Sequence, residues 1–169
     1  MLNFRFTTEN DVELYFKWAN DSLVRQNSIN SEKINLEDHI EWFNLKVTNP
    51  EVFMYLFFNE DDEPVGQVII ERKDDWVFIS QSVAQEHRGK KYSTEMLTRS
   101  TDDFLSKFAK DTIVSVVKSA NIASLKMSEK SGFNVIITDN KEHNCLVLKG
   151  YQQNDENYII KYKRFFNLL

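Results

Sequence analysis

The chain has 169 residues, of which 41% are hydrophobic, and a formal net charge of −5. This length and composition suit one compact domain, and the negative charge argues against a generic nucleic-acid or anionic-membrane binder. No apolar run approaches the roughly 20 residues that span a bilayer, and the N-terminus has no signal-peptide pattern, so we expect a cytoplasmic protein. One cysteine, Cys145, and three scattered histidines predict neither an internal disulfide nor a metal site.

The first third of the chain predicts one strand followed by helices. Residues 4–6 alternate apolar and polar side chains as in a short strand, and residues 8–19 begin with a capping box and continue as a helix. Residues 23–30 form a short helix or a loop. Asn35 can cap the next helix, which closes before Pro50. Its buried stripe is expected to contain four apolar residues at helical spacing: Leu36, Ile40, Phe43 and Val47.

The middle of the chain predicts an antiparallel meander of three strands separated by polar turns: 52–58, 65–71 and 76–83. Gly66, early in the second strand, indicates a bulge or a close approach of the backbone. A helix over residues 92–109 then links the third strand to a strand at 113–117, as in a βαβ unit. Asn121 opens a further helix that Gly132 ends. Three strand-like pieces complete the sheet in an order that the sequence leaves open: 133–138, 145–148 and 158–162.

A basic loop separates the strand at 76–83 from the helix that begins at Tyr92. The free N–H groups in the first turn of a helix and its dipole form a site for a phosphate or pyrophosphate. Arg88, Lys90 and Lys91 add positive charge where the anion would sit. The alternative is a solvated loop with ordinary surface lysines, which the loop by itself does not exclude.

The order of these segments resembles the GNAT family of acyl-CoA-dependent N-acetyltransferases: strand, basic loop, helix, strand, then Asn121-x-x-Ser124 up to Gly132-Phe133. The loop matches that family's pyrophosphate motif, Arg/Gln-x-x-Gly-x-Gly/Ala, in part. Lys91 stands where the first motif glycine is expected, and Ser93 where the second small residue is. The resemblance covers about residues 4–135. It implies a single α/β (α+β) domain over residues 1–169 with the GNAT fold, a mixed central sheet flanked by helices, and acetyl-CoA as cosubstrate without a metal.

The resemblance also implies where coenzyme A would bind. In this family the strand before the loop splays from its neighbour and offers main-chain groups to the pantetheine arm, and side chains at the later helix start contact the cofactor. The residues expected to bind it are therefore Gln81, Ser82 and Val83, then Arg88, Gly89, Lys90, Lys91, Tyr92 and Ser93, and finally Asn121 and Ser124. Asn121 would serve equally well as a helix N-cap, and the two roles are compatible.

The chemistry of amine acetylation predicts further residues. An alkylamine has a pKa of about 10.4, so a base or a desolvated pocket is needed near neutral pH. Glu71 is one candidate base, although its neighbours Arg72 and Lys73 favour a solvated turn carboxylate. Ser80 and Ser82 are weaker candidates that could position a water. Ser128 occupies the position where many family members have a tyrosine that protonates the departing thiolate. Because a serine hydroxyl is a poorer acid, either another group serves or CoA leaves as the thiolate.

Three N-terminal patterns resemble one branch of the family: Trp18-x-Asn20-Asp21, Val24-Arg25-x-Asn27-Ser28 and His39-x-x-Trp42-Phe43. That branch acetylates nucleotide-linked deoxyamino sugars, while ribosomal-protein Nα-acetyltransferases share a similar Trp-x-Asn segment. The acceptor-binding residues expected from it are Arg25, Asn27, His39 and Trp42. Arg25 could pair with a diphosphate and Trp42 could stack on a sugar or base. The alternative places His39 on the helix surface and Trp42 in the partial core.

Three functions therefore remain open at this point. The first is an acetyl-CoA-dependent amino-sugar N-acetyltransferase. The second is an enzyme of the same fold that acts on a ribosomal protein or another small amine. The third is a non-enzymatic acyl-CoA-binding module, which Lys91, Ser93 and Ser128 keep in consideration. The expected partner is a small-molecule amine, with neither nucleic acid nor membrane, and a homodimer is left open.

Overall fold

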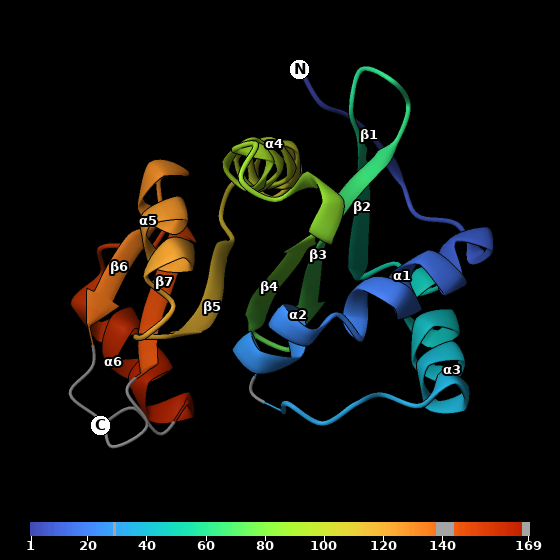
Figure 1. Ribbon diagram of the computed structural model, residues 1–169. Helices are drawn as coiled ribbons and strands as arrows, with labels where there is room; N and C mark the ends of the chain where they lie inside the picture. The colour runs from blue at the N-terminus through green and yellow to red at the C-terminus, as the bar shows by residue number, and fades with distance from the viewer. Residues whose placement is uncertain (29, 138–143, 167–169) are drawn as a thin grey trace. The chain divides into compact units, whose positions relative to one another are not determined.

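The computed structural model describes residues 1–28, 30–137 and 144–166. They contain seven strands and six α-helices (Figure 1), and the strands are hydrogen-bonded in the order β1-β2-β3-β4-β5-β7-β6. The sheet is mixed and helices flank it, as expected for the α/β class. The chain divides into two compact units, Met1–Glu71 with Ser80–Met96 and Arg72–Ile79 with Leu97–Leu169. Across the described residues, every helix is too short or too polar to cross a bilayer.

The first unit contains the antiparallel strands β1 (Asn3–Phe6), β2 (Val52–Phe58) and β3 (Pro64–Lys73), and β3 continues into the second unit. β1 pairs with β2, and β2 pairs with β3. The register of β2 and β3 shifts next to Gly66, where Phe57 lies opposite Gly66 but Phe58 lies opposite Pro64. Gly66 is therefore a point of irregular pairing, as its position in the sequence predicts.

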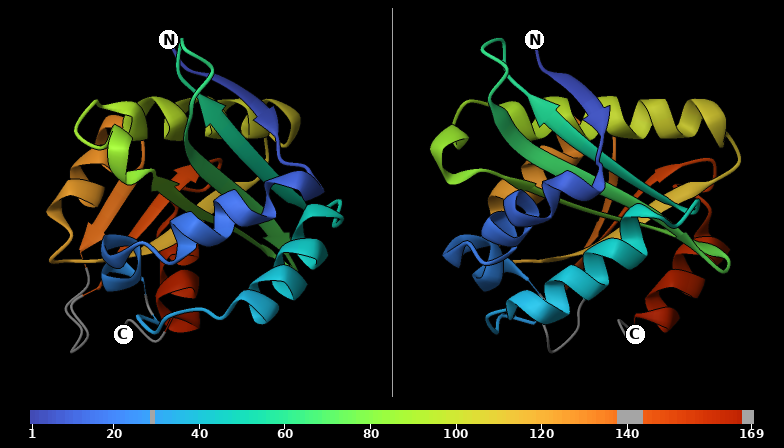
Figure 2. Two further views of the ribbon diagram at one scale, coloured as in Figure 1. Left: turned by 45° about the vertical axis from the view of Figure 1, so that its right-hand side comes forward. Right: turned by 90° about the vertical axis from the view of Figure 1, so that its right-hand side faces the viewer.

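Three helices belong to the first unit: α1 (Val12–Ala19), α2 (Ser22–Asn27) and α3 (Leu36–Val47). The predicted capping box between Thr8 and Asp11 is present in the 3₁₀ turn before α1, and Asn35 caps α3 by accepting from the Asp38 amide. α1 and α3 cover one face of β2 and β3 (Figure 2). The core between them consists of Tyr15, Trp18, Phe43, Met54, Leu56, Ile69 and Ala84.

The predicted stripe of α3 is wrong in part. Phe43 is fully buried, but Leu36 and Ile40 are 47% and 39% exposed, and His39 is only 2% exposed. The helix is rotated so that His39 and Phe43, which are four residues apart, share the buried side. The spacing allows two buried faces that share Phe43, one with Leu36, Ile40 and Val47 and one with His39. Ring contacts of His39 with Phe16 and Phe43 favour the second face.

The second unit is built on the parallel pair β4 (Trp76–Val83) and β5 (Thr112–Lys118), linked by α4 (Tyr92–Lys107). The second half of β4 and the first turn of α4 belong to the first unit. This βαβ connection confirms the prediction. The strands whose order the sequence left open are β6 (Asn134–Ile137) and β7 (Asn144–Gly150); β7 pairs antiparallel with both β5 and β6. Of the predicted strand at 133–138, residue 138 lies outside the described residues.

The predicted strand at 158–162 is wrong, because these residues lie inside α6 (Glu156–Phe165). Asp155 caps this helix by accepting from the Tyr158 amide, and Tyr158 and Tyr162 make an edge-to-face pair with centroids 4.7 Å apart. Tyr162 also packs on Trp76 at 4.4 Å, and its hydroxyl donates to the Thr112 carbonyl. Tyrosine and isoleucine favour strands by propensity, but ring packing at a spacing of four residues decides for a helix.

Candidate active site

The loop between β4 and α4 keeps the shape of an anion-binding turn with only one glycine. Gly89 and Lys91 both have left-handed backbone conformations, with φ of 79° and 65°. Lys91 thus adopts the conformation that the motif glycine usually supplies, at a strain cost of about 1–2 kcal/mol. Alternating backbone conformations of this kind turn successive N–H groups inward, which makes a concavity that suits a phosphate. The loop is therefore a candidate site for a phosphate or pyrophosphate.

The cationic side chains of this loop point in different directions. Arg88 donates from Nη2 to Asp21 Oδ1 at 2.5 Å and from Nε to the Val83 carbonyl at 3.3 Å. The Nζ of Lys90 lies 3.3 Å from Nδ1 of the buried His87. The side chain predicted to meet the pyrophosphate is therefore held at α2, and the exposed Lys91 is better placed to attract an anion.

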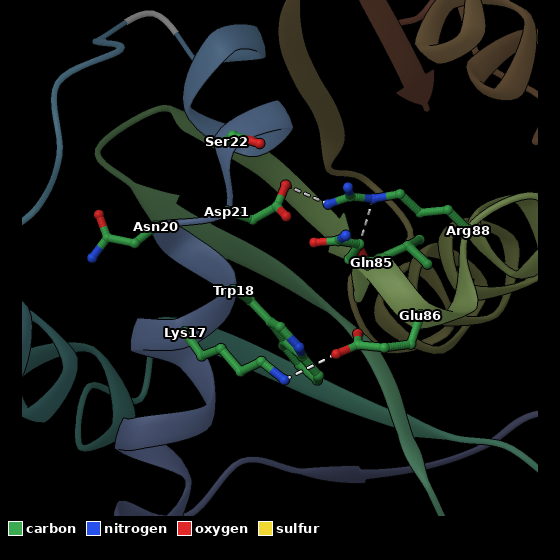
Figure 3. Close-up of a pocket in the computed structure, with 9 residues that line it drawn as sticks. Lys17, Trp18, Asn20, Asp21, Ser22, Gln85, Glu86 and Arg88 are labelled. Atoms are coloured by element: carbon green, nitrogen blue, oxygen red, sulfur yellow. Dashed lines mark hydrogen bonds and ion pairs between the residues drawn. The ribbon is translucent and has the colours of Figure 1, made fainter.

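A small cavity of about 290 Å³ lies where the end of α1 and the start of α2 face the residues after β4. Figure 3 shows two ion pairs across it, Arg88 with Asp21 and Lys17 with Glu86, the second at 3.0 Å. Burial alone would raise the pKa of the Asp21 carboxyl, but hydrogen bonds from Arg88 and from the backbone amides of α2 hold that pKa below its ordinary value. Asp21 therefore remains ionised and ties the loop to the start of α2.

A second cavity of about 420 Å³ is a candidate for the acceptor site. The three N-terminal helices and the segment after α2 supply part of its wall, and β3 and β4 supply the rest. Three of the four predicted acceptor-binding residues line it, and Asn27 does not, since it is exposed and donates to the Leu23 carbonyl at 3.0 Å. The lining residues are Tyr15, Ala19, Val24, Arg25, Ser28, Ile34, Asp38, His39, Trp42, Gln67, Ile69, Ser80, Gln81 and Ser82.

His39 and Trp42 form an aromatic part of this wall, with ring centroids 5.4 Å apart. The Nε2 of His39 lies 3.3 Å from the Val12 carbonyl. Burial lowers the pKa of the imidazole, and the contact with Val12 offsets this only in part. His39 is therefore a neutral, buried residue, and its alternative placement on the helix surface is wrong. Trp42 is 38% exposed, which leaves part of its ring available to a ligand.

Arg25 is positioned by the segment that follows α2. Its Nη1 donates to the carbonyls of Asn30 and Glu32, each at 3.3 Å, and its Nη2 donates to Ser28 Oγ at 3.0 Å. Its Nε is buried and has no hydrogen-bond partner among the residues that the structure describes. Because both Nη atoms are engaged, Arg25 offers the cavity a positive charge rather than a two-pronged fork for a diphosphate.

The candidate catalytic residues of the first unit have different surroundings. Glu71 accepts from Lys46 Nζ at 2.5 Å, both side chains are about a quarter exposed, and Glu71 is not among the residues that line the two cavities described above. It is a paired carboxylate, not the solvated one considered as the alternative. Ser80 and Ser82 both line the acceptor cavity; Ser80 is exposed, and Ser82 is buried.

Gln67 is a cavity residue that the sequence reasoning missed. It lies in β3, and its Nε2 donates to Ser82 Oγ at 3.2 Å. It is the one amide side chain in the otherwise apolar run from Val65 to Ile70. A polar residue inside an apolar strand is the sequence signal that could have identified it.

The second unit contains the remaining predicted residues, all on or next to α5 (Ile122–Lys130). Asn121 accepts from the Ser124 amide at 3.1 Å, so its role as the N-cap is confirmed. Ser124 is half-buried and Ser128 is 3% exposed. Gly132 follows the helix with φ of 84°, as expected for a residue that ends it. The described residues contain no cluster of three or more His, Cys, Asp or Glu side chains suited to a metal ion.

Comparisons with solved structures concern the fold of the chain. A domain from Methanocaldococcus jannaschii DSM 2661 has a TM-score of 0.75 at 19% identity, with 89% of this chain and 99% of that chain covered. Spermidine N-acetyltransferase from Vibrio cholerae, solved with CoA and spermine, has a TM-score of 0.73 at 14% identity, with 87% of this chain and 92% of that chain covered. An aminoglycoside acetyltransferase solved with coenzyme A and kanamycin has a TM-score of 0.73 at 16% identity, with 94% of this chain and 99% of that chain covered. At these identities the structures show a shared fold.

Sequence comparison identifies the family. Among curated proteins, none matches the chain. The family model described as an acetyltransferase (GNAT) domain matches residues 1–134, which is most of the chain. The chain therefore belongs to the GNAT family and is an N-acetyltransferase with acetyl-CoA as its cosubstrate.

Proposed function

We propose that this enzyme acetylates the primary amine of a nucleotide-linked deoxyamino sugar. The observation that carries the proposal is the 420 Å³ cavity in which Arg25, His39 and Trp42 come together. Trp42 supplies an aromatic face for a sugar or base, and Arg25 supplies the positive charge for a diphosphate. The neutral His39 beside them adds apolar surface and no competing charge.

The charge of the cavity supports this acceptor over a polycation. Its lining includes one carboxylate, Asp38, and one guanidinium, Arg25, so the formal charges cancel. Spermine and kanamycin, which are bound in the two neighbouring structures, carry several amines, and a site for such a molecule gains affinity from several carboxylates. The absence of a carboxylate cluster from this lining counts against a polycation, while Trp42 and Arg25 supply the flat surface and the cation that a sugar nucleotide would use.

The residues that line the acceptor cavity help to convert the amine to its neutral, reactive form. Acetyl-CoA, when bound, supplies the thioester carbonyl that the amine attacks. The apolar walls of the cavity desolvate the amine, which lowers its pKa and increases the neutral fraction. Ser80 and Ser82 would hold a water that takes the amine's proton as the C–N bond forms, and the bound thioester would supply the leaving thiolate. Ser128 remains the candidate donor to that sulfur, and Asn121 and Ser124 remain candidate CoA contacts.

Release of the CoA thiol tests the acceptor. The purified enzyme and acetyl-CoA are incubated with a UDP- or dTDP-linked 4-amino-4,6-dideoxy sugar, with spermidine, with kanamycin, and with an N-terminal peptide of a ribosomal protein. We expect kcat/KM for the sugar nucleotide to exceed the others by about a hundredfold or more, which corresponds to about 2.7 kcal/mol. Acetylation of the peptide alone would contradict the proposal and favour a protein acceptor.

Two matched variants test the cavity. Trp42→Ala removes the stacking surface and should lower kcat/KM for the sugar nucleotide about tenfold, while Trp42→Phe keeps a ring and should lose less. Both variants should bind CoA as the unsubstituted enzyme does, because Trp42 lies on α3 and not on the basic loop between β4 and α4, which we call the cofactor loop.

A further inference from the structure

The Trp18-x-Asn20-Asp21 pattern lies at the junction of α1 and α2, and each of its three residues has a different contact. Trp18 belongs to the buried core of the first unit. Asp21 pairs with Arg88 of the cofactor loop. Figure 3 shows the side chain of Asn20 pointing away from that ion pair. Asn20 therefore serves another part of the molecule than its neighbour Asp21 does.

Asn20 binds the backbone of a single residue with both ends of its amide group. Its Nδ2 donates to the Ile34 carbonyl and its Oδ1 accepts from the Ile34 amide, each at 2.9 Å. These are the distances of well-formed hydrogen bonds. Because the amide group is planar and has a donor and an acceptor side by side, it pairs with a main-chain N–H and C=O at once. The two bonds therefore fix the position of Ile34 relative to the end of α1.

The residues just before Ile34 hold Arg25 in turn. Nη1 of Arg25 donates to the carbonyls of Asn30 and Glu32, each at 3.3 Å. Residues 30–33 are exposed, so packing contributes little to their position and hydrogen bonds decide it. Arg25 and Ile34 both line the acceptor cavity. The bonds from Asn20 thus anchor the segment that places Arg25 in the wall of that cavity.

We propose that Asn20 is a positioning residue for the acceptor substrate. Its two bonds to Ile34 hold one wall of the acceptor cavity and, through residues 30–32, the guanidinium of Arg25. The assignment rests on the proposed acceptor cavity but not on which amine binds there. Asn20 thus acts on the acceptor side and Asp21 on the cofactor loop, so substitutions of the two neighbours should have separable effects on the two substrates.

Acceptor kinetics test this role. Asn20→Ala removes both bonds, so the acceptor has to order residues 30–34 as it binds. Its KM should rise about tenfold, while kcat and the affinity for CoA stay within about twofold. Asn44→Ala makes the same substitution at an exposed asparagine of α3 that does not line the cavity, and it should leave KM unchanged. Asn20→Asp keeps the acceptor for the Ile34 amide and removes the donor, so its KM should be intermediate.

Two measurements distinguish positioning from a general loss of stability. Without any acceptor present, hydrogen exchange of the Ile34 amide in Asn20→Ala should accelerate about tenfold or more, and the NMR resonance of Arg25 Nε–H should shift. A double-mutant cycle tests whether Asn20 acts through Arg25. Added to Arg25→Ala, the change Asn20→Ala should raise the acceptor KM by about twofold or less, because most of what it disturbs is already absent. Two independent effects would multiply in full.

Three results would each overturn the inference: an unchanged acceptor KM in Asn20→Ala, an unmoved Arg25 resonance, and losses that multiply in the double variant. Asn20→Asp undergoes the same tests, so the inference stays open to refutation even where the alanine variant fails to fold. Loss of the CoA-induced rise in melting temperature in both variants would place the defect in the whole fold, against the inference.

The kinetics use the amine that the enzyme acetylates fastest, which keeps the two proposals separate. A preference for a peptide over every sugar nucleotide contradicts the proposed acceptor, and the KM for that peptide still decides the role of Asn20. An enzyme that prefers the sugar nucleotide but has the same KM for it in Asn20→Ala contradicts the role of Asn20 and leaves the acceptor in place.

Discussion

Arg88 and Asp21 form a 2.5 Å ion pair between the cofactor loop and the N-cap of α2. The Asp21 carboxylate also accepts from the amides of Leu23 and Val24 at 3.0 and 3.1 Å. One side chain thus begins the helix that carries Arg25 and balances the charge of the motif arginine (Figure 3). A change at Asp21 should therefore affect both the stability of the protein and its affinity for CoA.

Asp21→Asn separates these two roles, because asparagine caps a helix as well as aspartate but cannot balance a charge. The freed guanidinium adds positive potential beside the loop, so CoA affinity should rise about threefold at low ionic strength and by less at high ionic strength. Titration calorimetry at two salt concentrations measures it. Asp21→Ala also removes the cap and should lose about 1 kcal/mol more of unfolding free energy. Unchanged CoA affinity in Asp21→Asn would show that Arg88 does not act on the cofactor.

Lys91 gives a prediction about strain and charge together. Lys91→Gly relieves a φ of 65° but removes the charge, so stability should hold or rise by up to about 1 kcal/mol while CoA affinity falls about tenfold and becomes less sensitive to salt. Lys91→Asn, which tolerates the same conformation, should show the same loss of affinity. Tighter CoA binding by the glycine variant would mean that the lysine side chain obstructs the site.

His39 predicts how stability depends on pH. Its pKa in the folded state is lowered by burial, so folding favours the neutral ring. The corresponding stability is complete above the unfolded-state pKa of about 6.5 and is lost as the pH falls below it. Denaturant titrations at about pH 8 and about pH 5 should show this loss, and His39→Phe should reduce it. An equal loss in the variant would assign the effect to other groups.

Gly66 predicts a steric limit on the sheet. A Cβ atom there would lie 2.5 Å from the Ser82 carbonyl oxygen and 2.7 Å from Met96 Cε. Gly66→Ala should therefore destabilise the protein by about 1–3 kcal/mol. Adding Met96→Ala should recover little, because the methionine can move but the backbone oxygen cannot. An unchanged free energy of unfolding in Gly66→Ala would show that the backbone of β4 shifts at Ser82 to make room for the added methyl group.

The sequence predicts those parts of the fold whose cause is local. β2 and β4 have the predicted bounds, because each is an apolar run between polar turns. The parallel pairing of β4 with β5 follows from the helix between them. By contrast, part of α6 resembles a strand in sequence, because tyrosine and isoleucine have strand propensity. The packing on Trp76 that favours the helix comes from about 80 residues earlier in the chain, so no local pattern reveals it.

The same distinction holds for the candidate site. Arg25, His39 and Trp42 are recognisable from short patterns, and the structure brings them to one cavity. The direction of a charged side chain, however, depends on partners that no local pattern contains. Arg88 reaches Asp21 across 67 positions of sequence, and Gln67 is held by Ser82 of the next strand. Both contacts exist only once the chain has folded.

The ion pair between Lys46 and Glu71 has a consequence for the basicity of the acceptor. Since this carboxylate is already matched with an ammonium, it does not act as the base, and the uncharged amine comes from the fraction that is neutral in solution and from desolvation in the cavity. For an amine with a pKa of about 10.4, the neutral fraction in solution is roughly four in ten thousand at neutral pH. Amines whose neighbouring oxygens withdraw electrons lose their proton more easily, and amino groups on oxygen-rich rings belong to that class. Across a series of amines of similar size, we therefore expect kcat/KM at neutral pH to rise as amine pKa falls.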